Sequence, residues 1–256
     1  MALTEQQFER YARHLILDDV GEEGQAKLMA ARVLVVGAGG LGSPLLLYLA
    51  AAGIGTLGIV DDDAVDLSNL QRQIVHPTAS IGTAKVESAR ATIAAINPDV
   101  RVEAHPQRLD QSNVAALVER YDLVADGSDN FATRYLLNDV CFAAQRTLVA
   151  GALSPFEGQL STFKAYLGPP HSCYRCLFRE PPPPDLVPRC ETAGILGAVA
   201  GVIGTLQATE VLKELLGLGD SLSGTLLMYD ALRADFHRIT VPRDPDCPTC
   251  GRREHV

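Results

Sequence analysis

The sequence predicts an α/β protein built on a Rossmann-like, doubly wound and mainly parallel sheet. Short β-branched runs alternate with longer helical stretches from residue 31 to residue 150. This alternation is the order expected of a parallel sheet with helices on both faces. A glycine-rich turn, Gly37 to Gly42, follows the first run and opens an apolar helix. A strand, a glycine turn, a helix and a second strand in that order form a βαβ unit.

The elements of the first half follow from periodicity and from residues that start or stop helices. Residues 1–30 are predicted to form one or two helices, and Thr4 with Gln7 fits a capping box at their start. Strands are predicted over residues 32–36, 56–60, 100–104, 121–125 and 147–150. The helices between them are predicted to end near Gly53 and to cover residues 83–96, 112–119 and 130–145.

The rhythm changes after residue 151. We expect a longer strand over 158–167, then a stiff proline-rich loop over 169–188 that continues neither a helix nor a sheet. A helix rich in small residues is predicted over 193–216, and closing strands over 225–229 and 236–241. We predict a single domain over residues 1–256, with these parts: N-terminal helices in 1–30, a nucleotide-binding core in 31–150, and an elaborated half in 151–256.

Composition excludes several classes of protein. The chain has 256 residues, of which 47% are hydrophobic and 21% charged, so it is neither disordered nor fibrous. Its net charge of −9 and its lack of Trp argue against a nucleic-acid partner. No signal peptide is visible, and the longest apolar stretch, 193–206, is shorter than the ~20 residues that span a bilayer. We therefore expect a cytoplasmic protein with no membrane segment.

The glycine-rich turn indicates nucleotide binding. Gly37, Gly39 and Gly42 form a G-x-G-x-x-G pattern, and Asp61 ends the next predicted strand. Glycine allows backbone N–H groups to approach a phosphate at a helix N-terminus, and the acidic residue would hold a ribose hydroxyl. The structural alternative is a turn that is glycine-rich only for packing. The glycines do not say which nucleotide binds.

Cations after the second strand favour chemistry on a triphosphate. Asn69, Arg72 and Gln73 lie in the loop that begins at Asp61, and Lys85 opens a later helix. Cleaving a triphosphate requires positive charge around the phosphates, whereas hydride transfer does not. Ordinary surface cations are the structural alternative.

A second loop carries a candidate magnesium ligand. Asp129 and Asn130 follow another predicted strand, and Arg134 lies four residues into the next helix. Mg²⁺ prefers one or two carboxylates together with phosphate oxygens, which suits Asp129. The alternative is structural: Asn130 caps the helix and Arg134 pairs with Asp129.

Two cysteine pairs predict a structural zinc site. Cys173 and Cys176, like Cys247 and Cys250, are separated by two residues. Four thiolates suit tetrahedral Zn²⁺, and two matched pairs in a protein expected to be cytoplasmic favour zinc over redox-active or free thiols.

Cys190 is a candidate nucleophile. It follows Arg189 and precedes the small-residue helix, and both a neighbouring cation and a helix N-terminus lower the pKa of a thiol. Such a thiol would attack an acyl or sulfur group. The alternative is an inert cysteine.

Together these residues resemble the MoeB/ThiF family, the prokaryotic relatives of ubiquitin-activating E1 enzymes, and most of all its molybdopterin-synthase adenylyltransferase members. The resemblance runs over nearly the whole chain. It is carried by Arg10–Arg13, Gly37–Gly42, Asp61–Gln73, Thr83–Val86, Asp129–Arg134, the two cysteine pairs and Cys190–Gly194.

The resemblance implies an enzyme that uses Mg-ATP to adenylate the C-terminal Gly-Gly end of a ubiquitin-like sulfur-carrier protein, with release of diphosphate. It further implies that Gly40 and Asp61 contact the nucleotide and that Asp129 binds Mg²⁺. Arg13 would reach the site from the other subunit of a homodimer, and Cys190 matches an acyl-accepting cysteine. The residues implied to hold the phosphates are Asn69, Arg72 and Lys85.

Three other functions stay open on the sequence alone. An NAD-dependent oxidoreductase would use the same glycines and Asp61. An E1-like enzyme acting on a modified tRNA base, or a zinc-stapled scaffold for a ubiquitin-like protein, would share the fold. The residue set favours adenylation, because a carboxylate nucleophile is already ionised at neutral pH and needs no general base.

Overall fold

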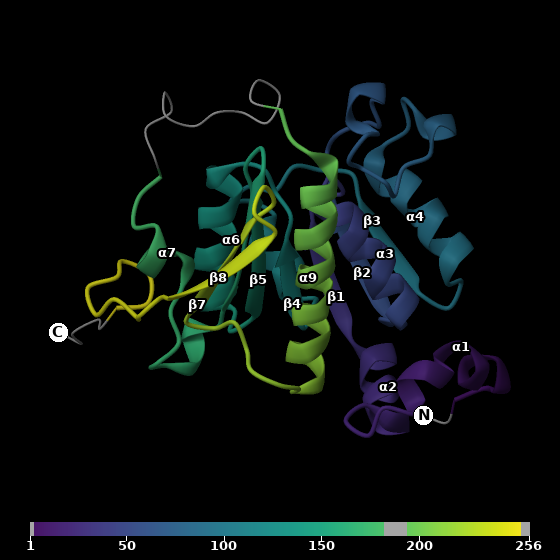
Figure 1. Ribbon diagram of the computed structural model, residues 1–256, viewed down its shortest axis with the longest axis horizontal. Helices are drawn as coiled ribbons and strands as arrows, with labels where there is room; N and C mark the ends of the chain where they lie inside the picture. Colours follow the sequence, from purple (N-terminus) through teal and green to yellow (C-terminus); the bar gives the residue numbers. More distant parts are fainter. Residues whose placement is uncertain (1–2, 182–193, 252–256) are drawn as a thin grey trace.

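A single eight-stranded sheet forms the centre of the molecule, and helices cover both of its faces (Figure 1). The computed structural model describes residues 3–181 and 194–251. The strand order is β3-β2-β1-β4-β5-β6-β7-β8. The strands are β1 (Arg32–Val36), β2 (Thr56–Val60), β3 (Arg101–His105), β4 (Leu123–Asp126), β5 (Thr147–Leu153), β6 (Glu157–Phe163), β7 (Thr225–Asp230) and β8 (Asp235–Thr240).

The helices and short helical turns alternate with the strands through the first half of the chain, as the sequence predicts. The α-helices are α1 (Glu5–Leu15), α2 (Gly21–Ala30), α3 (Gly42–Ala52), α4 (Lys85–Ile96), α5 (Val114–Val118), α6 (Phe131–Ala143), α7 (Tyr174–Leu177) and α9 (Gly197–Leu216). Single 3₁₀ turns occur at Leu67–Asn69, Thr78–Ser80 and Ala165–Leu167. Within the described chain, no helix combines the length and the apolar character that crossing a membrane would require.

The sheet is parallel from β3 to β5 and antiparallel from β6 to β8. The prediction of a doubly wound, mainly parallel sheet is therefore confirmed. The β-branched runs of β1 and β2 are buried on both faces, as central parallel strands require. Strand order reverses between β1 and β4, so the carboxyl ends of these two strands open the crevice where such sheets bind ligands.

Two hydrophobic cores lie on opposite faces of the sheet. On one face, α3, α4 and α9 bury residues such as Leu49, Ile93 and Val211. On the other face, α5 and α6 bury Leu117 and Leu137. Because α3 packs both on the sheet and beneath α9, its sequence is apolar around most of its surface.

Several boundaries differ from the sequence prediction. The strand predicted over 158–167 ends at Phe163, because a 3₁₀ turn at Ala165–Leu167 follows it. β5 runs on to Leu153, because it pairs with β6 in an antiparallel hairpin closed by a hydrogen bond from Ser154 N to the Glu157 carbonyl (2.9 Å). The extension of β5 arises from its pairing with β6, which a single-sequence pattern does not reveal.

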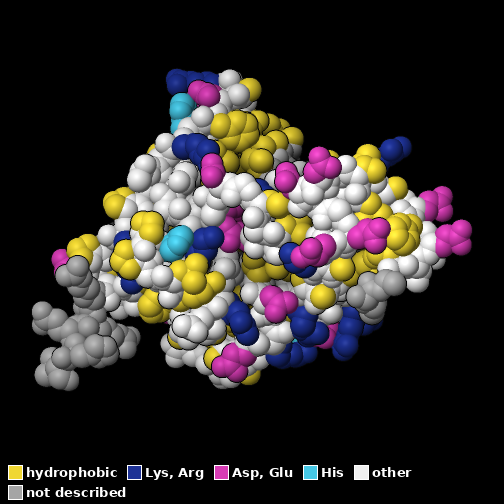
Figure 2. Space-filling model, turned by 90° about the horizontal axis from the view of Figure 1, so that it is seen from below, with side chains coloured by type: hydrophobic (Ala, Val, Ile, Leu, Met, Phe, Trp, Pro, Cys, Tyr) yellow, Lys and Arg dark blue, Asp and Glu magenta, His cyan; other side chains and the backbone are white. Residues whose placement is uncertain are grey.

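The amino ends of the parallel strands lie on the lower side of Figure 1, which Figure 2 views directly. Acidic and basic side chains are interspersed over this face (Figure 2). One carboxylate there, Glu103, is within 3.2 Å of Arg32 and Arg101 and within 2.6 Å of Arg120. This face therefore carries charges of both signs next to one another.

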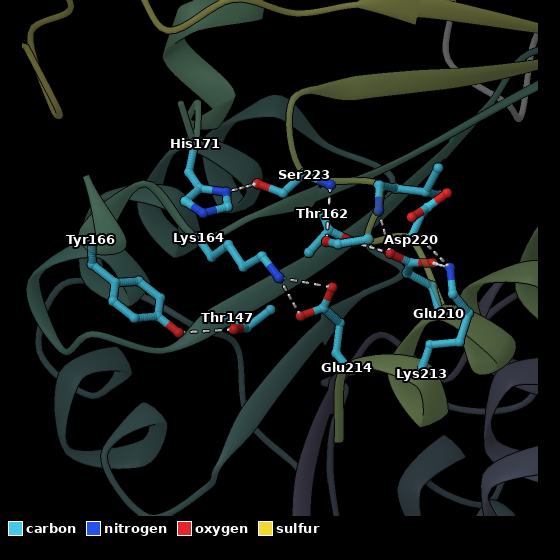
Figure 3. A network of polar contacts seen from close by, with 12 residues as sticks. Thr147, Thr162, Lys164, Tyr166, His171, Glu210, Lys213, Glu214, Asp220 and Ser223 are labelled. Carbon is cyan, nitrogen blue, oxygen red and sulfur yellow. Dashed lines mark hydrogen bonds and ion pairs between the residues drawn. The ribbon is translucent and has the colours of Figure 1, made fainter. Parts of the chain in front are cut away.

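A buried polar network fixes the carboxyl half of α9 to the antiparallel part of the sheet (Figure 3). Glu210 is 2% exposed, and its Oε1 accepts hydrogen bonds from Thr162 Oγ1 (2.9 Å) and Leu222 N (2.7 Å). Its Oε2 lies 2.6 Å from Lys213 Nζ. A buried carboxylate is tolerated only when it is paired and hydrogen-bonded, so Glu210 joins α9, β6 and the segment before β7 into one unit.

We expect Glu210→Ala to destabilise the protein, because it leaves the buried Thr162 hydroxyl and the Leu222 N–H without their acceptor and removes the carboxylate that pairs with Lys213. The free energy of unfolding should fall by roughly 3 kcal/mol, measured by urea denaturation. Glu23→Ala is the control, since Glu23 belongs to an exposed pair with Lys27 and its loss should change little. Equal stability of the Glu210 variant and the wild type would contradict the role given to this network.

Candidate active site

The glycine-rich turn after β1 has a backbone geometry that only glycine adopts easily. Gly37 has φ of +90°, and its N–H donates to the Val60 carbonyl at the end of β2 (2.8 Å). A Cβ at Gly42 would overlap the Gly37 carbonyl oxygen. The turn is therefore closed tightly against the start of α3.

This turn presents a row of unbonded backbone donors. Within residues 3–181 and 194–251, the N–H groups of Gly39, Gly40, Leu41 and Gly42 have no hydrogen-bond acceptor. They lie in the turn that leads into α3 and at its first residue, where the helix dipole adds partial positive charge. Such a turn at the carboxyl end of a β-strand is suited to bind phosphate groups.

Asp61 ties the end of β2 to the glycine-rich turn. Its Oδ2 accepts a hydrogen bond from Ala38 N (2.8 Å) and its Oδ1 accepts one from Asp63 N (2.9 Å). Burial raises the pKa of Asp61, while nearby Lys85 and these two hydrogen bonds act in the opposite direction. Each carboxylate oxygen keeps a further lone pair for a ligand hydroxyl.

The loop after Asp61 brings polar side chains against the turn. Arg72 packs on it, with its Cδ 3.6 Å from the position of a Cβ on Gly40, and its Nη2 donates to Asn69 Oδ1 (2.7 Å). Gln73 is buried, and its Nε2 lies 3.5 Å from the position of a Cβ on Gly39. The sequence-predicted residues Asn69, Arg72 and Gln73 are thus brought together at the glycines.

Lys85, the first residue of α4, reaches the same crevice. Its side chain is 5% exposed, and its Nζ donates to Asp63 Oδ2 (2.7 Å), whose own side chain is 65% exposed. A buried ammonium whose partner is an exposed carboxylate remains attractive to a second anion. Lys85 therefore adds positive charge beside the free N–H groups of the turn.

A second loop, residues 126–130 after β4, lies next to the glycine-rich turn. The Gly127 carbonyl oxygen is 3.0 Å from the position of a Cβ on Gly37. Asp126 is fully buried; its Oδ1 accepts from Ser128 N (2.9 Å), and its Oδ2 has no partner among the described residues. Burial raises the pKa of Asp126, and the neighbouring Arg134 opposes that shift.

The three other residues predicted for this loop and the start of α6 have different environments. Asn130 caps α6, since its Oδ1 accepts from Thr133 N (2.9 Å), as the structural alternative required. Arg134 donates to the Ser128 carbonyl (3.0 Å), and no ion pair joins it to Asp129 in the described part of the chain. Asp129 is exposed at the start of α6, so its carboxylate is accessible to a cation.

Arg13 does not join this crevice within one chain. It is an exposed residue of α1, and α1 packs through Tyr11 against Gly53 and Asn97, the residues that end α3 and α4. The crevice lies at the other ends of those helices. α1 therefore lies near the amino ends of the parallel strands, and the glycine-rich turn lies at their carboxyl ends (Figure 1).

Two buried residues of the site were given no role from the sequence, although His76 follows the predicted loop of Asn69, Arg72 and Gln73 closely. Gln207, in the middle of α9, donates from Nε2 to the carbonyls of Asp126 and Val149 (2.9 Å each) and so links the ends of β4 and β5. His76 contacts the carbonyl of Ala38 inside the glycine-rich turn (2.8 Å). The only available signal for Gln207 was an amide within an otherwise apolar helical stretch.

A groove of about 220 Å³ opens beside the second loop. Its floor is formed by β5 and β6, and its walls by the first turn of α6 and by α7. The lining is mixed, with aromatic side chains and a few polar groups, among them Phe131, Arg134, Gln159, Ser161, Tyr174 and Phe178. The groove therefore suits an extended peptide better than a highly charged ligand.

The four cysteines of the two predicted pairs meet in one cluster, where residues 247–251 fold back onto α7. The Sγ–Sγ distances are 3.9 Å for Cys173–Cys176 and 3.4 Å for both Cys173–Cys247 and Cys176–Cys250. Four thiolates around a tetrahedral zinc-sized ion would be about 3.8 Å apart. The cluster thus fits a tetrahedral metal ion, whereas the predicted nucleophile Cys190 lies outside the described residues.

The fold and the crevice define a Rossmann-type protein whose glycine-rich turn, suited to bind an anion, lies at the point where strand order reverses. Residues 11–249 match the ThiF family, and the chain belongs to this family, as the sequence resemblance predicted.

Several relatives are similar in sequence to this protein over nearly its whole length. The SAMP-activating enzyme E1 of Haloferax volcanii is 52% identical over 251 residues, which are 98% of this chain and 92% of that protein. The sulfur carrier protein adenylyltransferase of Thermus thermophilus is 49% identical over 256 residues, covering 98% and 93%. The adenylyltransferase and sulfurtransferase MOCS3 of Bos taurus is 51% identical, and the match covers all of this chain but 56% of that protein.

Among solved structures, Escherichia coli MccB with ATP superposes with a TM-score of 0.80 over 97% of this chain and 75% of MccB. The two sequences are 20% identical, so this likeness concerns the fold alone.

The buried ring of His76 makes stability depend on pH. Burial lowers the pKa of His76 and Lys85 lowers it further, while the Ala38 carbonyl and Asp61 act in the opposite direction. In the unfolded chain the ring takes up a proton near pH 6.5 that the folded ring resists, so this contribution to stability is lost as pH falls below that value. Between pH 7 and 5, wild type should lose more unfolding free energy in urea than His76→Gln. Equal losses in the two proteins would contradict this expectation. His237→Gln is the control: His237 is exposed, so this variant should lose as much unfolding free energy as the wild type.

Proposed function

We propose that this protein is an ATP-dependent adenylyltransferase that activates the C-terminal glycine of a ubiquitin-like sulfur-carrier protein. The observation that carries the proposal is the gathering of Arg72 and Lys85 beside the unbonded N–H groups of the glycine-rich turn. That much positive potential suits a triphosphate and has no use in hydride transfer, so an NAD-dependent oxidoreductase is not favoured. The names of the relatives support the same activity.

The reaction follows from the positions of these groups. The turn, Arg72, Asn69 and Lys85 would hold the phosphates, and Asp61 would accept hydrogen bonds from the ribose. The glycine carboxylate of the carrier, already ionised, attacks the α-phosphorus; a new O–P bond forms, the bond to the bridging oxygen breaks, and diphosphate leaves. Catalysis is then mainly alignment of the carboxylate with the leaving group and neutralisation of charge.

We assign the magnesium site to Asp129. Its exposed carboxylate at the start of α6 is a hard oxygen ligand next to the phosphate-binding turn, which fits the preference of Mg²⁺ for one or two carboxylates and phosphate oxygens. When bound, Mg²⁺ would neutralise charge on the triphosphate. Asn130 and Arg134 would keep the loop of Asp129 in place, through the helix cap and the hydrogen bond to Ser128.

We further propose that residues 31–150 bind the nucleotide and residues 151–256 the carrier, within one domain. The groove between α6 and α7 would receive the carrier's C-terminal tail, because it begins beside the loop of Asp129. A homodimer would supply Arg13 to the neighbouring subunit's crevice, which is supported by the exposure of Arg13 and its distance from its own site. The Cys190 thiolate would attack the carbonyl carbon of the acyl-adenylate, so that a thioester forms and AMP leaves. The carrier would serve molybdopterin or another sulfur-transfer biosynthesis in the cytoplasm.

ATP–diphosphate exchange tests this function. The wild type should catalyse exchange only with a carrier that ends in Gly-Gly, and Arg72→Ala and Asp129→Ala should each slow it by about 100-fold or more. Arg90→Ala, an exposed cation on α4 near Lys85 in sequence, should be unaffected. Exchange that needs no carrier, or wild-type rates in both variants, would overturn the assignment.

We propose that the cysteine cluster holds structural Zn²⁺. Four thiolate ligands, three of them from buried cysteines, leave no open coordination position, so the ion would contribute to folding and take no part in adenylation. Cys247→Ser should lose zinc, measured by elemental mass spectrometry, and lower the unfolding temperature. Cys141→Ala removes a buried cysteine outside the cluster and should keep one zinc per chain. Full zinc content in Cys247→Ser would refute the site.

A further inference from the structure

The peptide group of Ala38, within the glycine-rich turn, is held from both sides. Its N–H donates to Asp61 Oδ2 (2.8 Å), and its carbonyl oxygen lies 2.8 Å from His76 Nε2. Ala38 and His76 are both buried, so neither contact competes with bulk water. Asp61 is already assigned to the nucleotide, whereas His76 has no role in the reaction proposed above.

The partners of His76 specify its tautomer. A carbonyl oxygen only accepts, so the proton must sit on Nε2. Nδ1 is then an acceptor, and it lies 3.0 Å from Ser88 Oγ, whose hydroxyl donates to it. Ser88 belongs to α4, and the ring therefore links the glycine-rich turn to the helix that carries Lys85. The charged groups facing the ring are Lys85 and Asp61.

This contact determines where the next N–H points. In a planar trans peptide the C=O and N–H directions are opposed, so the Ala38 carbonyl aimed at His76 directs the Gly39 N–H away from the ring. Gly39 on its own would let that peptide group rotate at little cost. The Gly39 N–H is one of the four unbonded donors of the turn among the described residues.

We propose that His76, as the neutral Nε2–H tautomer oriented by Ser88, is a positioning residue that keeps the Gly39 N–H aimed at the nucleotide phosphates. This inference rests on the proposed function, since it assumes that the turn binds ATP. It adds to that function a residue that never touches the substrate and acts through the carbonyl of Ala38.

Three substitutions separate this role from simple packing. Gln can place its amide nitrogen near the position of Nε2, whereas Asn reaches only that of Nδ1, and both are neutral and polar. His76→Ala and His76→Asn should weaken ATP binding, measured by titration calorimetry, by about tenfold or more, the effect of losing one buried hydrogen bond. His76→Gln should remain within about threefold of wild type, and the KM for ATP in the exchange reaction should change more than kcat.

Ser88→Ala provides a second route if a substitution at His76 prevents folding. It leaves His76 in place but removes the hydroxyl that donates to Nδ1, and should weaken ATP binding severalfold in a protein that remains folded. In ¹⁵N spectra of the wild type, the Gly39 amide should shift on adding ATP, and this shift should be lost in His76→Asn.

Distinct outcomes overturn the inference and the function. If the wild type binds ATP and catalyses exchange while His76→Asn and Ser88→Ala bind ATP equally well, His76 is no positioning residue and the function stands. If folded His76→Gln binds as weakly as His76→Asn, the donor argument is wrong. If the wild type binds no ATP, the proposed function fails and this inference with it.

Discussion

At the glycine-rich turn after β1, three parts of the chain approach one another too closely for side chains. Gly37 faces the backbone of Gly127, Gly40 faces α9, and a Cβ on Gly204 of α9 would lie 2.5 Å from the Leu41 carbonyl. This packing orients α3 so that its first N–H groups open toward the crevice. The positions of the Asp61 loop and of the second loop both depend on it, because each contacts the turn directly.

The positive charges of the crevice are held in place by partners that do not neutralise them fully. Lys85 is paired with an exposed carboxylate, and Arg72 is oriented by the neutral amide of Asn69. Both cations thus retain most of their attraction for a further anion, whereas a cation enclosed by buried carboxylates would not. The carboxylate of Asp126, which is fully buried, is turned toward the backbone of its own loop, where it accepts from Ser128 N.

Helix α9 connects this crevice to the second half of the molecule. Its first turns pack on the glycine-rich turn, Gln207 spans the ends of β4 and β5, and Glu210 fastens its carboxyl half to β6. The cysteine cluster then secures residues 247–251 to α7, one wall of the groove. The two halves of the chain are therefore coupled through buried polar contacts as well as through the hydrophobic cores.

The sequence by itself determined the alternation of strands and helices, the glycine-rich turn, Asp61 and the two cysteine pairs. Each of these features follows from local periodicity or from a short motif, because neighbouring residues in the chain define its geometry. Only the tertiary structure decided that β6 ends at Phe163, that Asn130 caps a helix, that Arg13 lies far from its own crevice, and that His76 and Gln207 belong to the site. Those features depend on which distant segments pack together. The hydrogen bonds from His76 to Ala38 and from Gln207 to Asp126 join residues far apart in the sequence, so no local pattern predicts them.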